Sequence, residues 1–260
     1  MNRLLSGVDR NKDQSYFLCQ VSQRQLDNVL FPVGSLTKPE VRGIATELGL
    51  ATADRRDSQG ICFVGKVDLP VFLQQKLETK KGRIINVPQD HAFRTWPDGL
   101  PDNGTASGEL ALMAEPHTMG PGDGLTAGVH NGAHFYTVGQ RKGLNLGGYG
   151  EPLFVIATDT LNNLVYVGEG QMHKGLYRKG LFIRAQEVHW IRPDLAMTTG
   201  ESRDYDVRIR YRQPLQKGRL FAREEGYYII FEREQRGITP GQFAAWYDGE
   251  ELLGSGVIHE

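Results

Sequence analysis

The spacing of the apolar residues changes near residue 83, and this change limits the fold more than any other feature of the chain. Up to that point apolar side chains recur at helical spacing, and beyond it they alternate in short runs broken by Gly, Pro and Asn. The pattern predicts an α+β protein in which a helical part precedes antiparallel barrels or sandwiches. The predicted strands are 83–87, 134–138, 153–158, 164–168, 181–186, 204–212, 218–223, 226–232, 242–247 and 252–258.

Two capping boxes, at 22–25 and 37–40, predict where the first two helices begin. Pro32 should end the first helix, and Gly49 stands at the C-terminal cap position of the second. A third helix is predicted to begin at Asp68, with a proline in its first turn.

Residues 88–131 differ from the segments on either side of them. They are rich in Gly, Pro, Asp and Asn and contain a single arginine, Arg94. We expect a long, only partly ordered surface insertion here. Further along, Asn162–Asn163 separates two predicted strands and is typical of a hairpin turn.

The composition is typical of a soluble globular protein, since 39% of the residues are hydrophobic and 23% are charged. No apolar run approaches the ~18 residues that cross a bilayer, and no signal-peptide pattern is present. Cys19 and Cys62 suggest no disulfide framework and fit a reducing cytosol. We therefore expect a cytoplasmic protein without a membrane partner.

Charge is segregated along the chain, although its net charge is only −1. Residues 178–220 contain ten Lys or Arg against five acidic residues, whereas residues 221–260 contain three against eight. Two interpretations are open: one face binds an anionic partner, or basic strands pair with acidic neighbours. On charge alone, pairing between neighbours is favoured.

Cys62 lies in the segment 57–65, whose sequence is DSQGICFVG. The glycines allow close backbone approach to the thiol. Arg55 and Arg56 supply the positive charge that stabilises a thiolate, which is the nucleophilic form of cysteine. The alternative is a buried cysteine that packs as a small hydrophobe. Residue chemistry leaves both readings open.

A second polar cluster, 11–17, combines Lys12, Asp13 and Gln14 with an aromatic pair. A cation, a carboxylate and an amide side by side can hold phosphates and sugar hydroxyls. The same residues also suit a polar helix start in which Asp13 is the N-cap.

Two further motifs carry weaker signals. The glycine-rich loop 139–148 contains Arg141 and Lys142, which could contact phosphate, but it lacks the Gly-Lys-Ser/Thr ending of a P-loop. His130 and His134 stand four residues apart without a third ligand nearby, so no metal site is predicted.

The predicted strand 204–212 places Arg208, Arg210 and Arg212 on one face by alternation. Such a ladder of arginines suits a nucleic-acid backbone. The solvated outer face of a barrel is the alternative interpretation.

Taken in order, these segments resemble the tRNA-specific 2-thiouridylases. The matches keep the family's order over nearly the whole chain, except at 90–126, and the ordered set is far more specific than any single motif. The matching motifs are L-L-x-G-x-D-x-x-K-D-Q-S-Y-F-L at 4–18, F-P-x-G at 31–34, K-x-x-V-R-x-I-A at 38–45, D-S-x-G-I-C-F-x-G at 57–65, Y-T-x-G-Q-R-K-G-L at 136–144, R-Y-R-Q at 210–213 and T-P-G-Q at 239–242.

The resemblance implies a reaction and assigns its residues. In this family ATP activates the C2 oxygen of the wobble uridine, a cysteine persulfide attacks C2, AMP leaves, and a second cysteine releases the sulfur by forming a disulfide. Cys62 matches the persulfide carrier. Because alternation points Tyr211 inward, its contact with tRNA would need a strand end or bulge. The residues that match the family's tRNA contacts are Lys12, Asp13, Gln14, Arg210, Tyr211 and Gln242.

The family's ATP loop, S-G-G-x-D-S, and its other catalytic cysteine have no match here and would lie upstream of Met1. We therefore expect no cofactor on this chain, ATP with Mg in the missing region, and no activity of the chain alone. Cys19 is expected to pack, not to replace the second cysteine. A sulfur-donor protein is an expected partner besides tRNA. The alternatives are one subunit of a split enzyme with a separate ATP-binding chain, and a non-catalytic tRNA-binding module.

Three parts are expected along the chain. A helical remnant of the catalytic region, with the Cys62 loop, occupies 1–80, and a small β-rich central domain with the insertion at 88–131 occupies 81–172. A C-terminal antiparallel β-barrel, which resembles those of translation elongation factors, occupies 173–260.

Overall fold

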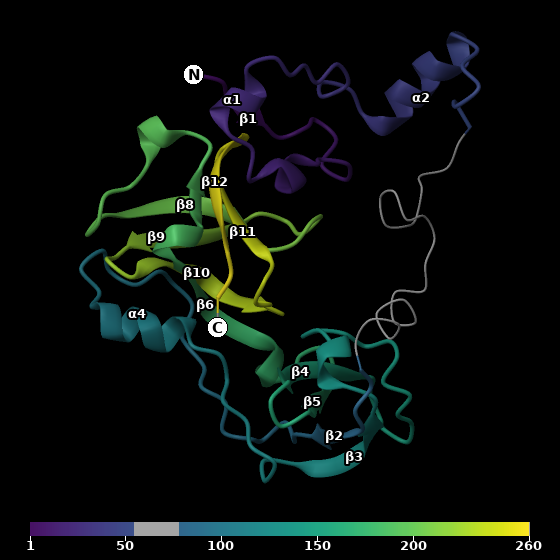
Figure 1. Ribbon diagram of the computed structural model, residues 1–260, viewed down its shortest axis with the longest axis vertical. Coiled ribbons are helices and arrows are strands. Elements are labelled where there is room, and N and C mark those ends of the chain that lie inside the picture. Colours follow the sequence, from purple (N-terminus) through teal and green to yellow (C-terminus); the bar gives the residue numbers. More distant parts are fainter. Residues whose placement is uncertain (55–77, 260) are drawn as a thin grey trace.

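The computed structural model describes residues 1–54 and 78–259. Two β-sheets form the framework of that part of the chain, and the helices beside them are short (Figure 1). The predicted third helix, which begins at Asp68, lies outside the described residues. None of the described helices is long and apolar enough to cross a membrane.

The larger sheet has eight strands in the order β1-β12-β11-β8-β9-β10-β6, with β7 paired to β12. Its pairs are antiparallel, as alternation predicts. A bridge from Phe182 in β6, at one end of the path, to His259, just beyond β12, closes these strands as in a barrel. The strands are β1 (Leu4–Leu5), β6 (Tyr177–Arg184), β7 (Val188–Trp190), β8 (Ser202–Arg208), β9 (Gln216–Ala222), β10 (Gly226–Arg236), β11 (Phe243–Asp248) and β12 (Glu251–Val257).

Strand β10 is buried on both faces because two layers cover it. Ile229 and Phe231 point into the core of the barrel. Tyr228 and Ile230 pack on the opposite face against α4 (Ser107–Ala114), which lies outside the barrel (Figure 1). This double burial explains why the strand begins as a continuous apolar run rather than an alternating one.

Residues 94–114, within the predicted insertion, form a strap across the outside of the barrel, and α4 is its one helix. Leu110 of α4 is fully buried. The Lys179 ammonium donates to the carbonyls of Pro97 (2.6 Å) and Gly99 (2.9 Å). Local composition could not reveal this packing, because it comes from contacts with strands far along the sequence. Further donors to carbonyls of the strap are Arg178, Arg219 and Arg223.

Leu110→Ala should lower the free energy of unfolding by about 3 kcal/mol, because it leaves a cavity between α4 and the barrel. Leu112 lies on the same helix but is 46% exposed, which makes Leu112→Ala the matched control. That variant should change stability by no more than about 0.5 kcal/mol. Denaturant-induced unfolding of the three proteins measures both values, and equal small losses would mean that the strap adds nothing to the fold.

The smaller sheet has the order β3-β2-β5-β4 and departs from the predicted antiparallel arrangement at one pair. β2 and β5 are parallel, which the long connection between them permits. Asn163, at φ 56°, turns the predicted β4–β5 hairpin. Residues 134–138 are not a strand, and the unpredicted β3 pairs with β2 instead. The strands are β2 (Gly82–Asn86), β3 (Leu125–His130), β4 (Leu153–Asp159) and β5 (Leu164–Glu169).

The first 54 residues contain both predicted capping boxes, which open α1 (Gln23–Leu26) and α2 (Lys38–Glu47). α1 is a single turn and ends well before Pro32. Gly49 follows α2 with φ 61°, as its cap position predicts. This part is not purely helical, because β1 joins the edge of the larger sheet. The 3-10 helices are η1 (Ser15–Leu18), η2 (Ala133–Phe135), η3 (Lys174–Leu176), η4 (Ala185–Glu187) and η5 (Pro193–Leu195).

Candidate functional site

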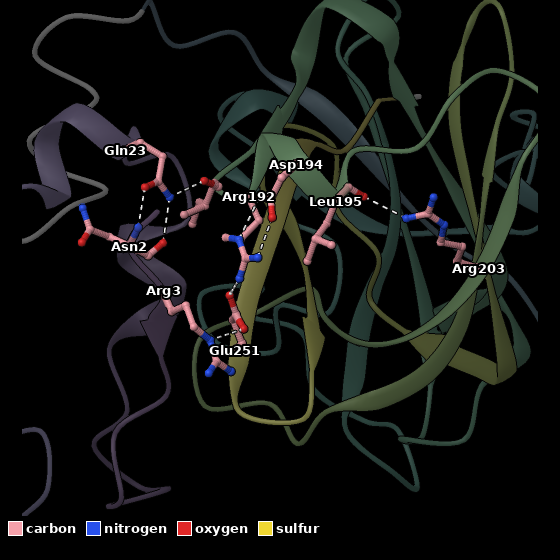
Figure 2. A network of polar contacts seen from close by, with 9 residues as sticks. Asn2, Arg3, Gln23, Arg192, Asp194, Leu195, Arg203 and Glu251 are labelled. Carbon is pink, nitrogen blue, oxygen red and sulfur yellow. Dashed lines mark hydrogen bonds and ion pairs between the residues drawn. The ribbon is translucent and has the colours of Figure 1, made fainter.

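An ion-pair network holds the N-terminal segment against the barrel (Figure 2). The buried carboxylate of Glu251 accepts from Arg3 Nε (2.6 Å) and from Arg192 Nη1 (2.5 Å). Arg192 also pairs with Asp194 (2.6 Å). Arg192 and Glu251 thus pair across the basic and acidic segments, as the interpretation by neighbouring charges predicts for these two residues. Similar pairs join Arg203 to Glu201, Lys217 to Asp206 and Arg219 to Asp204.

Asp13 forms a buried ion pair with Arg208, at 2.8 Å from Oδ2 to Nη1. Its carboxylate also accepts from the backbone and hydroxyl of Ser15 (both 3.0 Å) and from the Gly7 N–H (3.2 Å). Burial acts to raise the pKa of Asp13, but the bonds from Ser15, Arg208 and Gly7 outweigh it and hold that pKa below its usual value. Asp13 therefore anchors this segment to the barrel as a carboxylate.

Tyr16 and Phe17 continue the same attachment, a role that the sequence did not assign to them. The Tyr16 hydroxyl donates to the carbonyls of Phe243 (2.8 Å) and Ile209 (3.2 Å). Burial raises the pKa of Tyr16 to about 12. The Phe17 ring lies 4.5 Å from the ring of Tyr211. These contacts bring 12–17 together with the turn after β8 and the start of β11.

Lys12, Gln14 and Gln242 keep solvent access around this anchor. Gln14 is exposed, and Lys12 and Gln242 are half-buried. The carbonyl of Gln242 accepts from Ile258 N–H at 2.8 Å, which fixes the backbone just before β11. Three of the predicted contact residues therefore lie near the junction of 12–17 with the barrel.

Arg210 links the barrel to the smaller sheet's part of the chain. Its Nη2 donates to the carbonyls of Val138 (3.0 Å) and Gly237 (2.8 Å) and to the hydroxyl of Thr239 (3.0 Å). Burial, and then the charge of Arg236, lower the pKa of Arg210. Arg210 therefore has a structural role at this junction, and it is next to Tyr211, another residue predicted to contact tRNA.

The predicted ladder of three arginines on one solvated face is wrong. β8 ends at Arg208, which turns inward to Asp13. Arg212 adopts φ 64° and lies over the Tyr211 ring, 5.1 Å from its centroid. Because β8 has already ended, Tyr211 is half-buried in a turn, and the strand end that its contact required is present.

The glycine-rich loop 139–148 begins beside Arg210. A Cβ at Gly139 would lie 3.6 Å from Arg210 Nη1, an ordinary contact, and glycine is favoured here by its backbone φ of 85°. Arg141 and Lys142 are exposed on the loop. The loop and the residues after it enclose a cavity of about 350 Å³ that Arg141 lines. Two predicted phosphate contacts thus lie on a loop that starts at the same junction.

The structure describes one of the two cysteines, Cys19. Cys62, with Arg55 and Arg56, lies outside the described residues. Cys19 is 1% exposed and packs in a core cluster, and burial raises the pKa of its thiol. The prediction that Cys19 packs is confirmed. Within residues 1–54 and 78–259, no cluster of three His, Cys, Asp or Glu side chains could hold a metal.

Three family models match the chain one after another. The tRNA methyl transferase HUP domain matches residues 1–66, the tRNA methyl transferase PRC-barrel domain 117–169, and the aminomethyltransferase beta-barrel domain 181–258. The last match agrees with the predicted C-terminal barrel. The predicted lack of an ATP-binding region is not confirmed, because the HUP-domain match lies within this chain.

Curated relatives cover nearly the whole chain. The tRNA-specific 2-thiouridylases MnmA of Christiangramia forsetii, Flavobacterium johnsoniae and Karelsulcia muelleri are 52%, 51% and 42% identical to it. Each match covers 98% of the chain and 64% of the relative, so the chain spans about two thirds of their length. The relatives and the ordered domain matches together strongly support membership of the tRNA-specific 2-thiouridylase family.

Proposed function

We propose that this chain takes part in the 2-thiolation of the wobble uridine of tRNA, and that Cys62 carries the incoming sulfur as a persulfide. One observation supports the tRNA-binding part most directly. Segment 12–17, the turn at 209–211 and Gln242, far apart in sequence, are held together at one edge of the barrel by the Asp13–Arg208 pair and Tyr16. The family counterparts of these residues contact tRNA.

Each side chain at this edge has a distinct proposed role. Lys12 supplies a cation for a phosphate, while Gln14 and Gln242 offer amide groups to sugar or base edges. Tyr211, whose ring lies against that of Phe17 at a tilt of 44°, offers an aromatic surface to a base. Asp13 is assigned a positioning role, since its carboxylate is buried and paired.

Positive charge extends from this edge onto the neighbouring loop. Arg210 stands at the start of loop 139–148, which presents Arg141 and Lys142 to solvent. Backbone N–H groups of a glycine-rich loop and two cations can together bind a phosphodiester. We assign this loop a contact with the tRNA backbone, away from the base that reacts.

The sulfur chemistry falls to the chain's own thiolate. Cys62 accepts a sulfur atom from a sulfur-donor protein, and the terminal sulfur of its persulfide attacks C2 of the uracil. ATP, when bound, supplies activation of the C2 oxygen so that this oxygen can leave with AMP. A second cysteine then attacks the persulfide, forms a disulfide with Cys62 and leaves the transferred sulfur on the uracil. If the ATP site lies on another polypeptide, that chain is a further partner.

Gln14→Ala should weaken tRNA binding about fivefold, because it removes one hydrogen bond worth about 1 kcal/mol. Its stability should be unchanged, since Gln14 is exposed. Gln171→Ala, another exposed glutamine, is the matched control. Filter binding at fixed low salt measures the affinities. Equal affinities for wild type and Gln14→Ala would remove Gln14 from the interface.

Arg210→Ala should weaken tRNA binding more strongly and reduce the salt dependence of binding by about one counterion. Part of this loss will be structural, because Arg210 Nη2 also serves three acceptors at the junction. The slope of log affinity against log salt separates the two effects. A lower affinity with an unchanged slope would assign Arg210 to structure alone.

A further inference from the structure

A second cavity, of about 290 Å³, is lined by residues of the strap, of the segments on either side of it and of β6, none of which belongs to the edge described above. Most of its lining falls between the residues matched by the HUP-domain and PRC-barrel models. The lining is aromatic and basic. Its residues are His91, Ala92, Phe93, Arg94, Trp96, Leu112, Met113, Glu115, Pro116, His117, Thr118, Arg178 and Lys179.

The aromatic part of the lining is a cluster around Phe93. Its ring lies 4.7 Å from that of His91 and 5.1 Å from that of His117, both edge to face. His117 Nε2 lies 2.8 Å from the Tyr177 carbonyl, which fixes the imidazole, and burial lowers the pKa of His117. Trp96 adds a half-buried indole. Flat aromatic rings of this kind are stacking surfaces for nucleobases.

The basic part lies at the rim and the floor of the cavity. Arg94 is at the rim with its side chain 47% exposed, and it is held there by the Leu112 carbonyl (3.0 Å) and Glu115 (2.9 Å). Lys179 is at the floor, where it donates to backbone carbonyls of the strap. Three cations and one carboxylate line the cavity, a balance that favours an anionic ligand.

We propose that this cavity binds an unpaired nucleotide, with the base against the rings of Phe93 and Trp96 and the phosphate at Arg94. The inference rests on the proposed function, because it takes the nucleotide to be an unstacked one of the bound tRNA. A free nucleotide shares the same chemistry, and the experiment distinguishes the two. RNA-binding proteins commonly capture splayed bases in this way.

Tryptophan fluorescence tests the site directly, because stacking of a base on Trp96 quenches its emission. The other tryptophans, Trp190 and Trp246, pack against each other in the barrel core, 5.2 Å apart. Titration with tRNA should quench the wild-type protein, and Trp96→Phe should lose most of that quenching while keeping a ring in the same place. Adenosine monophosphate and a fully paired RNA duplex are the comparison ligands, and the duplex should give no Trp96-dependent signal.

Affinity measurements give a second readout. Arg94→Gln and His91→Ala should each lower the affinity for the ligand that quenches Trp96 about tenfold. Arg83→Gln, an exposed arginine on β2, is the matched control and should bind as wild type does. Quenching by tRNA alone assigns the site to RNA, and quenching by the monophosphate assigns it to a free nucleotide. The proposal is overturned if neither ligand gives Trp96-dependent quenching, or if Arg94→Gln and His91→Ala bind both ligands normally. Thiolation that still depends on Cys62 would then leave the proposed function standing.

Discussion

Replacing Cys62 with serine will abolish sulfur capture by this chain, and replacing Cys19 with serine will leave it intact. A serine hydroxyl cannot form a persulfide, so no residual transfer through position 62 is expected. Cys19 is buried, and its raised thiol pKa disfavours the reactive thiolate at pH 7. Incubation with a persulfide-donating protein, followed by peptide mass spectrometry, locates the added sulfur atom.

The Cys19→Ser protein is the matched control for this result, because it removes the only other thiol. Circular dichroism of both variants checks that each is folded. Added sulfur on Cys19 in the Cys62→Ser protein, or loss of capture in a folded Cys19→Ser protein, would reverse the assignment.

Arg208→Ala should lower the free energy of unfolding by about 3–5 kcal/mol, because it leaves the Asp13 carboxylate buried without its charge partner. The two side chains are only 6% and 1% exposed, so solvent screens the pair poorly. Lys217 and Asp206 form the matched exposed pair, with side chains 64% and 24% exposed. Lys217→Ala should cost at most about 1 kcal/mol. Equal losses in the two variants, measured by denaturant unfolding, would contradict the account.

The pH dependence of stability provides an independent check on the same pair. The pKa of Asp13 is lowered in the folded protein from a usual value of 3.8. A group with a depressed folded pKa contributes stability above its unfolded pKa and loses it as pH falls through the folded value. The Asp13 contribution should therefore be complete above about pH 5 and disappear only below pH 3.8. Without Arg208, one of the bonds that lower the pKa of Asp13 is gone, so the loss of stability below about pH 5 should be smaller than in the wild type.

Local features of the fold were predictable from the sequence because their causes are local. The capping boxes at 22–25 and 37–40, the Gly49 cap and the Asn162–Asn163 hairpin depend on residues a few positions apart. β1 and β3 were missed because two residues are too short for a periodic signal and β3 lies in a glycine-rich stretch. The packing of the strap could not be predicted from its own composition, because it depends on contacts with β6 and β10.

The candidate site could also be predicted only in part. The motif order identified 12–14, 210–211 and Gln242 as one group, and the structure brings them to one junction. Alternation alone could not place Arg208, because its inward turn is set by Asp13, almost the whole chain away. A buried carboxylate is strongly destabilising without a charge partner, so a cation that the fold places nearby pairs with it.

The most direct measurement is the 2-thiouridine content of tRNA from cells whose own copy of the gene encodes Cys62→Ser, compared with cells encoding Cys19→Ser. Digested tRNA is analysed by liquid chromatography and mass spectrometry, so the complete cellular machinery is present. We predict that wobble 2-thiouridine disappears with Cys62→Ser and persists with Cys19→Ser. A normal 2-thiouridine level in the Cys62→Ser cells would contradict the proposal that this chain carries the sulfur.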